Sequence, residues 1–373
     1  MQGDRKMVRT FASVVMLVCG VILLSMMLGC PGANRDQQVQ LPGDQIPQQP
    51  DQTPQQPSLT WLGTFGGDDS VAYDISADSS SVVVVGIAYD TKGNQRAFRW
   101  VNGRMEDLGT LGGNESEAYG VSADGSVVVG KAENAAGQMR AFRWTAGKME
   151  DLGSLGGEWI KATGVSADGS VVAGVSKNAA GQMRAFRWVN GRMEDLGTLG
   201  GGESEARGIS ADGSVVVGKA ENAAGQMRAF RWVNGRMEDL GTLGGGWSAA
   251  NGVSLDGSIV VGAAENAAGQ RHAFRWTAGR MEDLGTLGGD ESSAHDVSAD
   301  GSVVVGKSNG RAFRWTSKGG MEDLNETYAH LLTNGSELRA AYAISPNGRY
   351  IVGHGYNAIT KRLEAFLLDT GRP

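Results

Sequence analysis

The sequence of 373 residues has only two cysteines, Cys19 and Cys30, and both lie within its first 30 residues. The rest of the chain therefore has no disulfide, no reactive thiol and no cysteine-based metal site. Histidine is almost as scarce, with four scattered residues at positions 272, 295, 330 and 354. There is no nucleophile motif, no phosphate-binding glycine loop before a helix and no cluster of metal ligands. The sequence therefore predicts neither a cofactor nor a metal site, and it favours binding over catalysis.

Proline is scarce outside one segment. Six of the eight prolines fall within residues 31–58, together with a run of glutamines. This composition favours extended conformations and cannot bury a core. We interpret residues 30–58 as a disordered spacer.

Residues 1–29 have the features of an export signal. Arg5, Lys6 and Arg9 precede an apolar stretch, and Gly29 and Cys30 follow it. Residues 27–30, Met-Leu-Gly-Cys, resemble the lipobox of bacterial lipoproteins, in which the cysteine is lipidated and becomes the mature N-terminus. The resemblance implies lipidation of Cys30 and a membrane-anchored protein that faces the periplasm or the cell surface. The alternatives are an ordinary signal peptide of a secreted protein and an uncleaved membrane anchor.

Acidic residues outnumber basic ones, 41 to 34. Removal of the signal takes away three basic residues and one acidic residue, which changes the net charge from −7 to −9. An acidic surface argues against a nucleic-acid partner. We expect a monomer that contacts the membrane through its lipid anchor only.

One segment of about 44 residues is repeated along most of the chain. Tryptophans occur at 100, 144, 188, 232 and 276, and residues 107–150 and 195–238 are identical at 38 of 44 positions. A period of this length indicates a propeller, a solenoid or an array. The 58 glycines and the lack of a 3.6-residue period after residue 58 exclude a helical array.

Each repeat contains four strand signals. In residues 107–150 these are EAYGVS, the apolar run SVVVGKA, the alternating MRAFRW and KMEDLG. The turns between them are ADGS and TAGK, and the latter is VNGR in sister repeats, where Asn-Gly is a strong hairpin signal. Four antiparallel strands in 44 residues are typical of one blade of a β-propeller. Arginines of the Arg99 type are expected to pair with acids on the neighbouring fourth strand.

The ends of the chain complement each other. The first three strand types each occur seven times, but the MEDL-type fourth strand occurs six times, and LTWLGTFGG (59–67) aligns with MEDLGTLGG. We predict a seven-bladed β-propeller over residues 59–370, closed by pairing of 59–63 with 364–368. An open β-solenoid is the alternative, and it leaves the complementary ends unexplained.

The repeated segment resembles the repeats of a known family. HAFRW at 272–276, MEDLGTLGG and GVSxDGSxVVG are similar to the HAF family of bacterial extracellular repeats, over residues 59 to about 368. The resemblance implies an exported or surface location and no established biochemical activity. Five repeats carry arginine where this one has His272, so we assign that histidine no special role.

Candidate site residues are those at which the repeats differ. The residue that follows the alanine of each first strand is diverse while its neighbours are nearly constant, and all seven can hydrogen-bond. First strands of a propeller line its channel, so we predict a ligand site at the channel mouth. The longer segment 325–339 is expected to hang over the same mouth. The candidates are Tyr73, Tyr119, Thr163, Arg207, Asn251, His295 and Tyr342, with Trp159, Trp247, Tyr328 and His330 close by.

Two functions remain open on the sequence. The first is a lipid-anchored binding module for a glycan or a protein. The second is an exported enzyme that acts on polysaccharide at the same mouth, since two carboxylates at a suitable separation are able to hydrolyse a glycosidic bond.

Overall fold

We describe a computed structural model, in which residues 56–77 and 81–371 are described. Contacts divide the chain into Met1–Gln52 and Thr53–Pro373, and the fold below belongs to the second unit. The predicted signal peptide, Cys30 and nearly all of the spacer lie outside the described residues. Within the described ranges, no helix has the length and apolarity that crossing a membrane requires.

The fold is almost entirely β-strand, in the predicted repeat of four. The first strands are β2 (Gly66–Ala77), β6 (Gly112–Val121), β10 (Gly156–Val165), β14 (Gly200–Ile209), β18 (Gly244–Val253), β22 (Ser292–Val297) and β26 (Glu337–Ile344). The second strands are β3 (Val82–Asp90), β7 (Val127–Asn134), β11 (Val171–Asn178), β15 (Val215–Asn222), β19 (Ile259–Asn266), β23 (Val303–Ser308) and β27 (Tyr350–Asn357).

The two outer strands of each repeat form a hairpin. The third strands are β4 (Gln95–Val101), β8 (Met139–Thr145), β12 (Met183–Val189), β16 (Met227–Val233), β20 (Arg271–Thr277), β24 (Arg311–Thr316) and β28 (Arg362–Asp369). The fourth strands are β5 (Arg104–Asp107), β9 (Lys148–Asp151), β13 (Arg192–Asp195), β17 (Arg236–Asp239), β21 (Arg280–Asp283) and β25 (Gly320–Asp323). β1 (Ser58–Gly63) takes this position beside β28.

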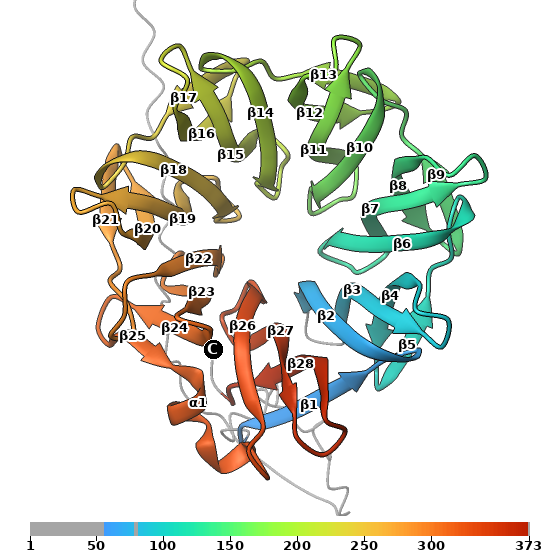
Figure 1. Cartoon of the computed structure of the whole chain (residues 1–373), viewed down its shortest axis with the longest axis vertical. Coiled ribbons are helices and arrows are strands. Elements are labelled where there is room, and N and C mark those ends of the chain that lie inside the picture. Colours follow the sequence, from blue (N-terminus) through green and yellow to red (C-terminus); the bar gives the residue numbers. More distant parts are fainter. Residues whose placement is uncertain (1–55, 78–80, 372–373) are drawn as a thin grey trace, which may run out of the picture. The chain divides into compact units, whose positions relative to one another are not determined.

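These strands form sheets that we call blades. Five sheets hold four antiparallel strands each, in sequence order. β26, β27, β28 and β1 form another such set, which a single parallel bridge between Asp69 and Leu363 joins to β2–β5. The first strand of each blade is innermost and the fourth is outermost (Figure 1).

The two ends of the described chain meet in one blade. β1 pairs antiparallel with β28, with Leu59 opposite Leu368 and Trp61 opposite Phe366. This is the pairing predicted between residues 59–63 and 364–368. The contact between neighbouring blades is repeated here, because Ala365 N–H donates to Ser70 Oγ at 2.8 Å just as Ala97 N–H donates to Ser116 Oγ at 3.0 Å.

A β-bulge interrupts every first strand at the same place. In β6, Ala118 lies opposite Gly130 and Gly120 lies opposite Val129, which leaves Tyr119 without a partner on β7. The same shift occurs in β2, β10, β14, β18, β22 and β26. A bulge re-aims the side chain of its extra residue and increases the local twist.

The glycine at the end of each VVG-type run makes room for this bulge. A Cβ added to Gly130 would lie 1.9 Å from the carbonyl oxygen of Glu117 and 2.9 Å from the ring of Phe142. The corresponding distance to the first-strand carbonyl is 1.9 to 2.1 Å for Gly86, Gly174, Gly218, Gly262, Gly306 and Gly353. Only glycine fits where two backbones approach so closely.

The predicted turns and ion pairs are present. Asn102 and Gly103 have φ of 51° and 84°, as the Asn-Gly hairpin turn requires. Asp124 accepts from the N–H of Ser126 at 3.0 Å and so closes the ADGS turn. Arg99 lies 3.6 Å from Glu106, and its Nε also donates to the carbonyl of Gly125 in the next blade at 3.1 Å.

The structure differs from the sequence prediction in two respects. Each first strand of the regular repeats begins earlier than expected, because Gly112 and its equivalents already pair with the second strand. The segment after β25 also forms a short helix, α1 (Leu324–Thr327), and a 3₁₀ turn, η1 (Ala329–Leu331). Asp323 caps α1 by accepting from the N–H of Asn325 at 2.9 Å, a local hydrogen bond that no periodicity reveals.

The close approach at Gly130 leads to a first prediction. Gly130→Ala forces a methyl group against the Glu117 carbonyl, so we expect the free energy of unfolding to fall by about 1–3 kcal/mol. Gly246→Ala is the control, because an added Cβ there meets only a flexible Glu265 oxygen at 3.7 Å. Urea denaturation measures both, and equal stability of the two variants would contradict the role given to Gly130.

Candidate functional site

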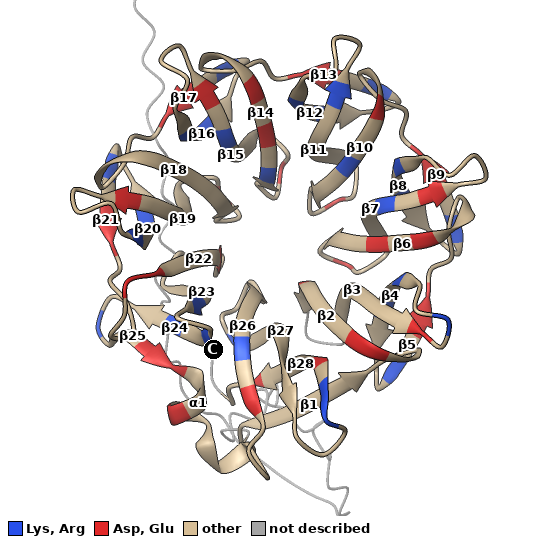
Figure 2. Cartoon of the chain, viewed as in Figure 1, with Lys and Arg blue, Asp and Glu red and all other residues tan. Residues whose placement is uncertain are grey.

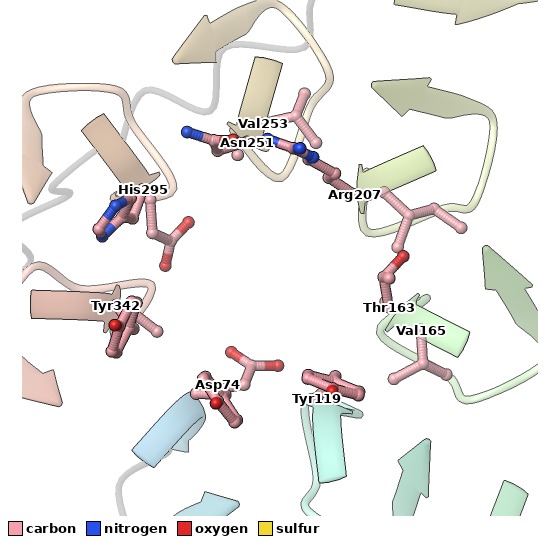
Figure 3. A pocket seen from close by; sticks show the side chains of 16 residues that line it. Asp74, Tyr119, Thr163, Val165, Arg207, Asn251, Val253, His295 and Tyr342 are labelled. Carbon is pink, nitrogen blue, oxygen red and sulfur yellow. Dashed lines mark hydrogen bonds between the residues drawn. The ribbon is translucent and has the colours of Figure 1, made fainter. Parts of the chain in front are cut away.

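All seven diverse residues of the first strands line one cavity. Its volume is about 160 Å³. Figure 3 shows their side chains surrounding an open centre. Each is the extra residue of its bulge, so the bulge is what aims it inward. The seven are Tyr73, Tyr119, Thr163, Arg207, Asn251, His295 and Tyr342.

One half of the cavity is aromatic. The ring centroid of Tyr73 lies 5.2 Å from that of Tyr119 and 5.5 Å from that of Tyr342. His295 stacks on Tyr342 with centroids 5.1 Å apart and an interplanar angle of 18°. The ammonium of Lys161 lies 5.0 Å from the Tyr119 ring centroid. These distances are typical of favourable aromatic and cation–π contacts.

The other half is polar and holds neighbouring blades together. Arg207 Nη1 donates to Asn251 Oδ1 at 2.7 Å, and Asn251 Nδ2 donates to the carbonyl of Ala294 in the next blade at 2.7 Å. Thr163 Oγ1 likewise donates to the carbonyl of Ala206 at 3.0 Å. Part of the diversity at these positions therefore has a structural use.

His295 also has a structural role. Its Nδ1 lies 2.8 Å from the Ala341 carbonyl, so Nδ1 carries a proton and Nε2 is left as the acceptor of the neutral ring. Burial lowers the pKa of His295 to about 4. The ring is therefore neutral at physiological pH and acts as a flat wall and a hydrogen-bond acceptor.

Two carboxylates that the sequence prediction missed also face the cavity. Asp74 and Asp296 directly follow Tyr73 and His295, whereas the other five blades have glycine or alanine there. Asp74 accepts from the N–H of Ile75 at 2.8 Å and from the N–H of Val121, in the next blade, at 2.9 Å. Asp296 does the same with Val297 and Ile344, at 2.8 and 2.9 Å. A comparison of the repeats at the position after the bulge residue would have found both aspartates.

Burial raises the pKa of both carboxyl groups. The pKa of Asp74 rises from 3.8 to about 7, first by burial and then by the charge of Asp296, and that of Asp296 rises to about 6 by burial. The two backbone N–H bonds that each receives oppose the shift by favouring the ionised form. Asp74 is therefore partly protonated near neutral pH.

A second cavity of about 170 Å³ continues beyond the first. Five residues border both cavities, and we call this ring the waist: Asp74, Val165, Ile209, Val253 and Asp296. The second cavity is lined mainly by small and apolar side chains of the ADGS-type turns. The polar groups that could orient a ligand are therefore concentrated in the first.

Four predicted site residues lie away from the first cavity. Tyr328 is 5% exposed and packs in the core, where Arg314 donates to its hydroxyl at 3.3 Å, so its expected place over the mouth is wrong. His330 is exposed on η1, which the helical turn holds beside α1 rather than over the first strands (Figure 1). Trp159 and Trp247 do not line the cavity, and Trp247 packs against Arg271, 4.5 Å from its ring centroid.

His272 replaces an arginine in an ordinary ion pair. Its Nδ1 lies 2.8 Å from Asp283 Oδ2, where Arg140 Nε lies 2.9 Å from Asp151 Oδ2 in a sister repeat. The pair lies on the outer hairpin, away from the cavity. The expectation that this histidine has no special role agrees with its position. Within residues 56–77 and 81–371, no group of three histidines or acids is placed to hold a metal.

The chain is similar to solved β-propellers in fold. The β-propeller domain of the Trilobed protease from Pyrococcus furiosus has a TM-score of 0.53 and 10% identity, over 81% of this chain and 93% of that one. A puromycin-hydrolyzing peptidase from Mycobacterium tuberculosis also has a TM-score of 0.53, with 15% identity over 84% of this chain. The blades and these likenesses define the protein as an all-β protein of the β-propeller class.

The remaining comparisons add no activity. TolB from Acinetobacter baumannii is 14% identical over 82% of this chain, with a TM-score of 0.43. The chain spans 64% of that TolB and 55% of the peptidase. No family model and no curated protein sequence matches the chain.

The raised pKa of Asp74 leads to a second prediction. The folded state keeps a proton on Asp74 that the unfolded state releases above its pKa of 3.8, so this stability is full at low pH and is lost as pH rises through about 7. Burial also lowers the pKa of His295 and His354 to about 4, so their contribution makes stability rise with pH between about pH 4 and pH 6.5 and opposes the Asp74 contribution. The comparison is therefore with Asp74→Ala, which introduces the residue found at Ala343: in urea denaturation, the free energy of unfolding of the unchanged protein relative to this variant should be larger at about pH 5 than at about pH 8. An identical pH dependence in both proteins would contradict the assignment.

Proposed function

We propose that the protein is an exported, lipid-anchored, seven-bladed β-propeller of the HAF type that binds a sugar in its channel. One observation carries the proposal: the first-strand position that carries five kinds of side chain in seven repeats is the position that the bulge turns into the cavity. Substitutions that accumulate without selection in solvent-exposed loops would not concentrate at this one position. The pairing of β1 with β28 and the Ala365–Ser70 hydrogen bond support closure of the ring through a shared blade.

The chemistry of the cavity favours a single sugar ring. The rings of Tyr73, Tyr119 and Tyr342 form an aromatic wall in which Tyr73 is tilted by 35° to Tyr119 and by 58° to Tyr342, and their faces suit the apolar face of a pyranose. The polar half of the cavity offers donors and acceptors for the sugar hydroxyls. A volume of about 160 Å³ is close to the roughly 150 Å³ of an apolar cavity that holds one benzene molecule, so it has room for one ring and not for several. The site is therefore suited to the end of a glycan rather than to a long chain.

Anchoring and export rest on the N-terminal sequence. The signal, the resemblance of residues 27–30 to a lipobox and the spacer together favour a tether at Cys30 that holds the propeller away from a membrane. A protein segment that enters the channel is the alternative ligand.

A third prediction tests sugar binding. Tyr73→Ala combined with Tyr342→Ala removes two of the three tyrosines of the aromatic wall, so capture of the bound sugars on a glycan array should weaken at least about tenfold. His272→Arg, which restores the sister residue far from the cavity, is the control and should bind as the unchanged protein does. Thermal unfolding of the double variant checks that it is folded. Capture that survives in a folded double variant would show that the cavity is not the site.

One observation favours a second candidate, an exported enzyme acting on polysaccharide. Asp74 has its pKa raised to about 7 beside a second carboxyl group, Asp296, as a general acid requires. However, both oxygens of each carboxylate already accept a backbone N–H. Product formation from a panel of polysaccharides, lost in Asp74→Ala, would establish this role, and absence of turnover would exclude it.

A further inference from the structure

At the level of the waist, each of the seven blades has an equivalent backbone N–H group, which belongs to the second residue after the bulge residue. Four of these seven N–H groups donate to carboxylates. Asp74 takes those of Ile75 and Val121, and Asp296 takes those of Val297 and Ile344. Each carboxylate thus bridges two adjacent blades.

The three remaining N–H groups of the ring belong to consecutive blades. They are those of Val165, Ile209 and Val253, and we call them the waist amides. No side chain of the described residues accepts a hydrogen bond from any of them. Each follows a glycine, so no side chain of its own strand covers it: the glycines are Gly164, Gly208 and Gly252.

The strand register shows where the waist amides point. Ser166 N–H donates to Val171 O at 2.8 Å, which makes the preceding opposed pair, Val165 and Val172, the non-hydrogen-bonded one. The N–H of such a residue points away from the partner strand. The same holds in β14 and β18, where Ser210 and Ser254 donate to the second strand at 2.9 Å. Because first strands are innermost, all three N–H groups point toward the channel (Figure 1).

The first cavity opens onto this part of the waist. The residues lining it include all three waist-amide residues and their three glycines, in addition to the seven bulge residues. On the opposite side, Asp74 and Asp296 cover the ring of N–H groups. The four residues whose N–H groups they accept from do not line the first cavity: Ile75, Val121, Val297 and Ile344. Figure 3 shows Asp74 reaching into the channel on the side opposite Val253.

We propose that the waist amides and Arg207 bind a carboxylate group of the ligand, which makes the ligand an acidic sugar of the uronic acid type. The protein supplies its own template, since Asp74 and Asp296 place a carboxylate between equivalent N–H groups of adjacent blades. A ligand carboxylate takes the same position between Val165 and Ile209, or between Ile209 and Val253. This inference rests on the proposed function and adds the class of sugar.

The charges around the site suit an anion. Arg207 is the bulge residue of β14, two positions before Ile209, and its guanidinium lies in the cavity, where it donates to Asn251. It also forms an ion pair with Glu205 at 3.5 Å, and because Glu205 pairs with Lys219 at 3.1 Å as well, the three groups together carry a net positive charge. Lys161 and the exposed Lys307 lie on β10 and β23, and Lys161 forms no ion pair with a described carboxylate. The opposing charge of Asp74 and Asp296 is reduced, because burial raises the pKa of both. Hydrogen bonds from several N–H groups to one anion are strong because the acceptor is charged.

Calorimetry with two sugars tests the carboxylate site. D-glucuronate and D-glucose have the same ring, but glucuronate has a carboxylate where glucose has a hydroxymethyl group. Glucuronate should therefore bind at least about tenfold more tightly. Arg207→Gln should reduce that preference to below about threefold. Equal affinity for the two sugars in the unchanged protein would overturn the proposal.

A substitution that copies Asp74 tests the waist amides directly. Gly164→Asp places a carboxylate where it takes the N–H groups of Val165 and Ile209, so glucuronate binding should fall at least about tenfold. The chain tolerates this residue at two equivalent positions, and an added Cβ at Gly164 meets no atom closer than 3.1 Å. Gly164→Ala is the steric control and should cost less than about threefold. Undiminished glucuronate binding by a folded Gly164→Asp protein would overturn the proposal.

The outcomes separate this inference from the proposed function. If glucose binds as tightly as glucuronate and Tyr73→Ala with Tyr342→Ala weakens the binding of both, the proposed sugar site is supported and the proposed carboxylate site is wrong. N-acetylglycine has a carboxylate but no sugar ring. If it binds more tightly than glucuronate and Gly164→Asp abolishes its binding, the carboxylate site is supported and the sugar site is wrong. If glucose, glucuronate and N-acetylglycine all fail to bind, both proposals are wrong.

Discussion

The close contact between a first-strand carbonyl and a second-strand glycine determines the rest of this structure. Because Gly130 and its equivalents have no side chain, the first strand bulges toward the second, and one extra residue is turned into the channel. The alanines before the bulge residues are fully buried, and the bulge turns the extra residue, which differs between repeats, into the cavity. The repeat thus keeps a constant framework and presents one variable side chain per blade.

The charged side chains are divided between two tasks. Most lie on the outer hairpins, where pairs such as Arg96 and Asp107 cover the short fourth strands (Figure 2). Such exposed pairs contribute little stability, but charges on an edge strand discourage pairing with other chains. Of the charged residues on the inner strands, Arg207, Asp74 and Asp296 line the cavity, and Glu205 pairs with both Arg207 and Lys219.

The repeat made much of this fold predictable. Four strand signals, the Asn102–Gly103 turn and the missing seventh MEDL-type strand, which residues 59–67 replace, predicted the blades and the pairing of β1 with β28. Diversity after the first-strand alanine located the cavity residues correctly. The bulge was not predictable, because it depends on the register between strands. Asp74 and Asp296 were missed for a related reason: their role appears only when the N–H groups of adjacent blades are seen together. Tyr328 was misplaced because its burial depends on α1, which a single capping hydrogen bond begins.

The central claim is that the bulge residues serve binding while their neighbours maintain the fold. Saturation substitution of Ala206, Arg207 and Gly218 in one blade, with the folded fraction measured by resistance to protease, tests it most directly. The guanidinium of Arg207 has its hydrogen bond and its ion pair with side chains, those of Asn251 and Glu205, so most replacements there should leave the protein folded. Ala206 is fully buried and Gly218 faces a carbonyl, so almost none should be tolerated at either. Equal intolerance at Arg207 would mean that the variable residues are structural, and would contradict the account.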